Sequence, residues 1–314
     1  MRRRRVRHTG RLLQTVIYLG KLFRMFLFQN DWKVLPMSAI IAAMVSMAVG
    51  RGLFVSMEGT FQGSFALTCV CIWNGFFNSI QSICRERAIL KREHRAGLHI
   101  TSYVAAHLIY QLFLCTSQVI ITVIVCGKLG LKYPQNGTIE NNFMPEFFIT
   151  LLLITYTADV MALMISAIVK TQMAAMTVMP FMLIIQLVFS GFLALPAALT
   201  DVSDLMISKW GAQALCATSR YNDLQAVMIW NKMAASGDNI DIGGFATIKD
   251  VMNFIDEQGM RDTVLNKLSE ASKRPDFDST FTNLLGCWGH LILFMIVFAI
   301  ITVVFLEYID RDKR

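Results

Sequence analysis

The chain has 314 residues, of which 55% are hydrophobic and 16% charged, with a mean hydropathy of +0.51 and a net charge of +7. A soluble domain carries about 25% charged residues, so the composition argues against one and predicts a polytopic membrane protein. The basic run Arg2–Arg5 with Arg7 lies close to apolar segments, so we interpret it as a cytoplasmic anchor beside anionic lipid and not as a nucleic-acid-binding tag.

The first segment, residues 1–33, is predicted to be cytoplasmic and to hold an amphipathic helix at residues 11–28. Arg11, Gln14, Tyr18 and Lys21 recur at helical spacing opposite an apolar face. A helix of this kind lies in the membrane interface. It is either a simple anchor or a connecting helix that contacts a cytoplasmic partner, and the spacing does not separate the two.

Six segments are apolar enough to cross a bilayer, which takes about 20 mostly apolar residues. They are 34–54, 64–84, 102–127, 146–169, 174–195 and 284–306. The second is the most polar, because it holds Asn74, Asn78 and Gln81. The expected fold is therefore an all-α membrane protein. Its domains are the cytoplasmic segment 1–33, helices 1–5 over 34–195, an outer segment 196–283, the last span 284–306 and a tail 307–314.

Lysine and arginine indicate the orientation of these spans. They are concentrated before the first span, between spans 2 and 3, and after the last span. The alternate loops are poorer, with Arg51 in one and Lys128 and Lys132 in the other. Basic residues favour the cytoplasmic side. We therefore expect both termini in the cytoplasm, a multi-pass protein of the plasma (inner) membrane, and the segment 196–283 outside.

The loop at residues 85–99 reads RERAILKREHRAGLH and is too charged to enter lipid. A short cytoplasmic helix is expected there. It is either a solvated loop that fixes the topology or a coupling helix that presses on another protein, and the residues alone leave both interpretations open.

The outer segment divides into two parts. Residues 197–230 are moderately apolar and suit pieces that dip into the outer leaflet without crossing it. Residues 231–280 are polar. They predict a helix from Thr247 to Gly259 and a second helix over 261–272 that ends near Pro275.

Motifs for enzyme chemistry are missing from the sequence. There is no GxxxxGK[ST] phosphate-binding loop, no HExxH and no GxSxG, so the chain is expected to be no enzyme and to hold no cofactor or metal. Asp159 is the one acid well inside a span, and either a proton relay or a helix-pairing role suits it. Cys126, Cys216 and Cys287 are placed where they could face outside, and a disulfide among them is allowed but not required.

The order of several short motifs is more specific than any one of them. Span 2 runs into ERAILKRE at residues 86–93, span 5 ends in FSGFL at 189–193, and ATSRYNDLQA stands at 217–226 before the long outer loop. This order, over about residues 10–310, resembles the membrane domain of the G subfamily of ABC transporters and its bacterial type-2 permease relatives.

The resemblance implies roles for particular residues. Glu86, Arg87, Arg92 and Glu93 would belong to a coupling helix that contacts the ATPase. A central cavity between two membrane domains would be lined near Asn74, Phe77, Ile184 and Leu187. Phe192 and Leu193 would form an apolar plug that closes this cavity toward the outside.

The chain also departs from that family pattern. In the G subfamily the ATPase is usually fused ahead of the membrane domain, whereas only residues 1–33 precede the first span here. ABC ATPase subunits, which carry ATP and magnesium, are therefore expected on a separate chain. The residues 217–219 replace the usual Ser-Pro before Arg-Tyr. The cargo of the family is therefore not assigned to this chain.

The expected function is that of the transmembrane subunit of an ATP-driven exporter, paired with a second copy of itself or a related permease. It would move an amphipathic lipid, drug or peptide outward by alternating access. The alternatives are an ATP-independent carrier that uses Asp159, or a membrane scaffold whose outer loop binds a partner.

Overall fold

The structure, a computed structural model, describes residues 10–28, 31–49, 52–135, 137–139, 142–191, 200–227, 230–233 and 248–308. Within these ranges the chain is all-α, and its only β-type contact is an isolated bridge between Ser56 and Gln225. The main helices are α1 (Arg11–Phe28), α2 (Val34–Val49), α3 (Met57–Ser79), α4 (Ser82–Arg95), α5 (Ile100–Lys128), α6 (Phe143–Ile168), α7 (Gln172–Val188), α9 (Ile207–Thr218), α11 (Ile248–Glu257), α12 (Arg261–Ser272) and α13 (Phe281–Glu307). Short pieces are α8 (Thr200–Ser203) and the 3-10 turns η1 (Asp31–Lys33), η4 (Tyr221–Asp223) and η5 (Pro275–Phe277).

Three of these helices, α5, α6 and α13, are long and apolar enough to cross a membrane. The helices α2 and α7 are apolar but shorter, with 16 and 17 residues. The helix α3 has 23 residues and is more polar than α2 or α7. The last part of the predicted span 174–195 and the predicted plug, Phe192 and Leu193, lie outside the described residues.

The predicted second span, 64–84, extends too far along the chain. The helix α3 ends at Ser79, and α4 starts at Ser82 after a break at Ile80 and Gln81. The reason is a hydroxyl from another helix: Ser166 Oγ of α6 accepts hydrogen bonds from the Ile83 and Cys84 amides, both at 3.1 Å. The first amides of a helix lack partners within it, so this hydroxyl satisfies the start of α4.

The helix α6 is the centre of the bundle. In its most apolar stretch 67% of the residues are buried inside the subunit, against 17% for α13. It packs along α3, where Gly75 allows a very close approach: a Cβ atom at position 75 would lie 2.3 Å from the Thr155 carbonyl oxygen and 2.7 Å from the Asp159 amide nitrogen. Small residues permit such backbone contacts between membrane helices.

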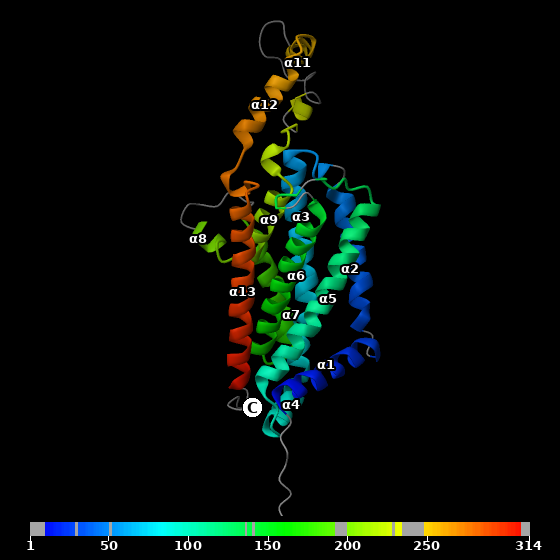
Figure 1. The fold of residues 1–314 in the computed structure, drawn as a ribbon, viewed down its shortest axis with the longest axis vertical. Coiled ribbons are helices and arrows are strands. Elements are labelled where there is room, and N and C mark those ends of the chain that lie inside the picture. The colour runs from blue at the N-terminus through cyan, green and yellow to red at the C-terminus, as the bar shows by residue number, and fades with distance from the viewer. Residues whose placement is uncertain are drawn as a thin grey trace, which may run out of the picture.

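The helices α1 and α4 lie at one end of the bundle, and α11 and α12 project at the other end (Figure 1). The helices predicted at 11–28 and 261–272 correspond to α1 and α12, and the helix predicted from Thr247 to Gly259 corresponds to α11, which runs from Ile248 to Glu257. Gly259 has a φ of +66°, which suits the residue that follows a helix.

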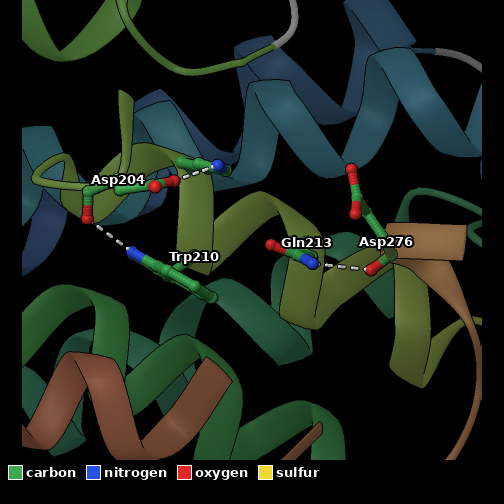
Figure 2. A network of polar contacts seen from close by, with 5 residues as sticks. Asp204, Trp210, Gln213 and Asp276 are labelled. Atoms are coloured by element: carbon green, nitrogen blue, oxygen red, sulfur yellow. Dashed lines mark hydrogen bonds and ion pairs between the residues drawn. The ribbon is translucent and has the colours of Figure 1, made fainter. Parts of the chain in front are cut away.

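The helix α9 belongs to the moderately apolar part of the outer segment. It packs against α3, α6 and α13, and most of its residues are buried. Polar contacts hold the first two turns of α9 (Figure 2): Trp210 Nε1 donates to the Asp204 carbonyl at 2.8 Å, and Gln213 Nε2 donates to the Asp276 carbonyl at 2.8 Å. All seven cysteines are free, including Cys126, Cys216 and Cys287, so the disulfide that the sequence allowed is not formed.

Replacing Gly75 with alanine should destabilise the fold, because the new methyl group would collide with the backbone of α6. Overpacking of this kind costs about 1–3 kcal/mol. The measurement is the midpoint of thermal unfolding of the detergent-solubilised protein. Gly286→Ala is the matched control, because nothing lies within 4 Å of a Cβ there. Equal midpoints for the two variants would contradict the close approach of α3 and α6.

Candidate functional site

The helix α1 is attached to the bundle through its polar face. Gln14 Nε2 donates to the Gly97 carbonyl at 3.3 Å, and Gln14 Oε1 accepts from the His99 amide at 3.0 Å. The Tyr18 ring meets the Tyr103 ring edge to face, with centroids 5.2 Å apart. The apolar side chains of the opposite face, Leu12, Val16 and Phe28 among them, are exposed. A helix with polar residues inward and apolar residues outward suits a lipid interface.

An ion pair joins α1 to α4. Lys21 Nζ lies 3.2 Å from Glu86 Oε2, and the Glu86 side chain is 8% exposed whereas that of Lys21 is 34% exposed. A nearly buried carboxylate requires a partner of this kind, because an isolated buried charge is very costly. The pair therefore fixes α1 and α4 relative to each other.

A second set of contacts joins α4 to the end of α6. Arg87 Nη1 donates to the Ala167 carbonyl at 2.8 Å and to the Val169 carbonyl at 3.1 Å. The last carbonyls of a helix lack partners within it, and a cation beside them also interacts favourably with the helix dipole. Together with the Ser166 hydroxyl at the start of α4, Arg87 makes α4 a rigid continuation of the bundle.

The remaining side of α4 is exposed. Arg85, Ala88, Ile89, Arg92 and Arg95 are exposed and follow a spacing of three and four residues, which puts them on one face of the helix. Of the four residues expected to contact an ATPase, Glu86 and Arg87 point into the subunit, whereas Arg92 belongs to this exposed face. Burial raises the pKa of the fourth, Glu93, whose Oε2 has no hydrogen-bond partner among the described residues.

The residues expected to line a cargo cavity differ in how exposed they are. Phe77 of α3 and Ile184 of α7 are exposed, at 47% and 55%, and Leu187 is half-buried. Asn74 is 5% exposed and therefore lies inside the subunit, not on the surface that carries Phe77. Exposed apolar side chains on α3 and α7 leave this side of the subunit free to meet lipid or a second subunit.

Asp159 is fully buried between α3 and α6. Its Oδ1 accepts a hydrogen bond from Ser79 Oγ at 2.9 Å, and its Oδ2 has no partner among the described residues. Asn78 pairs with Gln118 of α5 close by, through two amide hydrogen bonds of 2.9 and 3.0 Å. Asp159 thus takes part in helix pairing, which was one of the two roles that its position suggested.

Sequence reasoning missed the contacts that hold α4 in place. Lys21 lay on the predicted polar face of α1, but nothing in the sequence connects it with a residue 65 positions away. Ser166 was an isolated hydroxyl in an apolar segment, which is the only signal for its role. In the described ranges no group of three His, Cys, Asp or Glu side chains could hold a metal ion.

The fold and this arrangement define a class: an all-α membrane subunit with a charged helix firmly attached at one end. The family model for ABC-2 type transporters matches residues 12–218, so the chain belongs to the ABC-2 type transporter family. Members of this family are permeases, the membrane components of ABC transporter systems in which an ATPase drives transport.

A relative among the known proteins is the ABC transporter ATP-binding/permease protein Rv1747 of Mycobacterium tuberculosis. It is 30% identical over 154 residues, which cover 47% of this chain but 17% of the relative. The chain therefore matches a small part of a much longer protein.

The ion pair between α1 and α4 predicts a measurable coupling between Lys21 and Glu86. Lys21→Met and Glu86→Gln should each lower the midpoint of thermal unfolding, and the double variant should lose less than the sum of the two. A coupling of about 1 kcal/mol is expected for a partly buried pair. Additive effects in this double-mutant cycle would contradict a stabilising pair.

The raised pKa of Glu93 predicts a pH-dependent effect on stability. The folded state favours the protonated carboxyl, so the ionised form destabilises the protein above the pKa of the folded state. Glu93→Gln should therefore raise the unfolding midpoint at pH 8, and this gain should disappear by about pH 4, where the wild-type carboxyl is protonated. A gain that does not change with pH would exclude this explanation.

Proposed function

We propose that the chain is the transmembrane subunit of an ATP-driven ABC exporter, with six membrane spans and both termini in the cytoplasm of the plasma (inner) membrane. The ATPase, with its ATP and magnesium, is supplied by a separate subunit. A second copy of the chain or a related permease completes the pathway for an amphipathic cargo.

The attachment of α4 is the observation that supports this proposal most directly. A helix can transmit a force to the rest of a protein only if it is rigidly attached to it. The Lys21–Glu86 pair, the Ser166 hydroxyl and the Arg87 guanidinium fix α4 to α1 and α6, so force applied to its exposed face passes to the central helix of the bundle. The exposed face with Ile89 and Arg92 is the proposed contact with the ATPase.

In the proposed mechanism, ATP binding closes two ATPase subunits, and their motion reaches the bundle through α4 and α1. Two permease subunits then change from a cavity open inward to one open outward. The exposed residues Phe77 and Ile184 support a cavity between subunits, with Leu187 beside them. Asn74, being buried, would act there through packing, and Phe192 and Leu193 would close the outer end.

The test is co-purification from the native membrane, followed by measurement of ATPase activity. Ile89→Glu and Arg92→Glu should remove most of the co-purifying ATPase, because one disrupted contact at the centre of an interface weakens binding about tenfold or more. Lys132→Glu is the matched control, since Lys132 is an exposed cation at the opposite end of α5.

Three results separate this function from the others. Loss of the ATPase in the two α4 variants but not in Lys132→Glu supports the exporter and this contact surface. Equal retention in all variants moves the contact away from α4. A preparation without any ATPase favours the ATP-independent carrier or the scaffold.

A further inference from the structure

A cavity of about 240 Å³ lies inside the subunit, at the end of the bundle where α1 and α4 meet (Figure 1). Its described walls come from α1, α2, α3, α4, α5 and α7, so one subunit is enough to form it. Leu22 and Met25 bring α1, the helix suited to the lipid interface, into this wall. The cavity therefore lies at the depth where the glycerol part of a lipid meets the acyl chains.

One polar side chain of the cavity wall has no partner. His107 lines the cavity and is 2% exposed, yet neither Nδ1 nor Nε2 has a hydrogen-bond partner in the described structure. Its ring contacts Tyr103, with centroids 4.6 Å apart. A buried polar group without a partner costs free energy, so such a group beside a cavity indicates a ligand or ordered water that satisfies it.

The charged groups of the wall indicate that this ligand is uncharged. Glu86 is paired with Lys21, and Arg85 has an interaction partner of its own. The amide of Asn78 exchanges two hydrogen bonds with Gln118. A ligand with a net charge would therefore meet no unused counter-charge in the described part of the wall, and burial of an unpaired charge is very costly.

The histidine limits which uncharged groups fit. A protonated ring at this degree of burial would itself be an unpaired charge, so the ring is neutral. A neutral imidazole has one N–H donor and one nitrogen that accepts. The matching ligand must offer both a donor and an acceptor. A free hydroxyl next to an ester carbonyl offers both, whereas a fully esterified glycerol offers acceptors alone.

The apolar part of the wall indicates how the ligand is attached. Leu114 lies along the cavity, and Phe77 and Met176 are exposed at its edge, at 47% and 41%. In a bilayer this edge faces acyl chains. The cavity therefore combines one hydrogen-bonding side chain inside with an apolar opening toward lipid.

We propose that this cavity binds the head of a diacylglycerol, whose free hydroxyl and ester carbonyl pair with His107 and whose acyl chains leave between Phe77 and Met176. The site requires only that the chain lies in a membrane. It would hold even if the ATPase contact proposed above failed its own test.

Native mass spectrometry of the delipidated full-length chain, with any ATPase that accompanies it, tests this site. The probes are dioleoylglycerol, its acetyl ester with the hydroxyl blocked, dioleoyl phosphatidylglycerol and free glycerol. We expect one dioleoylglycerol per subunit to bind most tightly. The acetyl ester should bind about tenfold more weakly, because it loses one good hydrogen bond.

Variants of His107 test its contact with the hydroxyl. His107→Phe keeps a ring but removes both nitrogens, so the preference for dioleoylglycerol over its acetyl ester should fall from about tenfold to about one. His107→Gln keeps a donor and an acceptor and should retain a preference of about threefold or more. A purely structural role of the ring would weaken both lipids equally and leave the preference unchanged.

Matched controls lie outside the described wall. Gln111→Met removes another buried polar side chain of α5, one turn further along, and should leave the preference unchanged. Met176→Trp obstructs the exposed edge and should weaken both lipids about tenfold, even if His107→Phe fails to fold. Met173→Trp, on the same helix and 79% exposed, should weaken neither.

Equal binding of the acetyl ester to the wild-type chain would overturn the role of the hydroxyl. Phosphatidylglycerol bound as tightly as dioleoylglycerol would contradict the selection of an uncharged head. Glycerol bound as tightly would assign the site to a soluble polyol and overturn the lipid. An unchanged preference in His107→Phe, or equal losses in Met173→Trp and Met176→Trp, would place the bound lipid outside this cavity.

Discussion

The close contact between α3 and α6 at Gly75 is the constraint on which the rest of the structure depends. It brings the two backbones together and buries Asp159 against Ser79, which donates a hydrogen bond to the Asp159 carboxylate inside the subunit. The other elements then arrange around α6: α9 and α13 pack along it, and α4 starts on its Ser166 hydroxyl. The helix α3, which is more polar than α2 or α7, is therefore buried along much of its length.

The two ends of α6 hold different parts of the chain in place. At one end Glu146, in its first turn, accepts hydrogen bonds from the Thr138 and Ile139 amides at 2.7 and 2.6 Å and so fixes the preceding loop. At the other end Ala167 and Val169 receive Arg87 of α4. A displacement of α4 is therefore transmitted to the centre of the bundle through a direct contact with α6. The helices α2 and α7, by contrast, each have an exposed face.

The helices were largely predictable because hydrophobic periodicity and length depend on local sequence. The helix 11–28 has the predicted bounds, and α5, α6 and α13 fall within a few residues of the predicted spans. The break at Ile80 and Gln81 was not predictable, since a hydroxyl from a residue more than 80 positions away causes it. Likewise the sequence placed Glu86 and Arg87 on the right helix, but the direction of each side chain depends on α1 and α6, which periodicity does not reveal.

The docking of α1 has a consequence for how the chain is made. Its hydrogen-bond partners, Gly97, His99 and Ser102, lie 83 to 91 residues further along the chain. At roughly 5–20 residues per second of synthesis, α1 leaves the ribosome several seconds before they exist. Throughout that interval the exposed leucines and phenylalanines of α1 can hold it at the lipid surface. The apolar face that lies on the surface of the folded subunit can therefore keep α1 bound to the membrane until its hydrogen-bond partners have been synthesised.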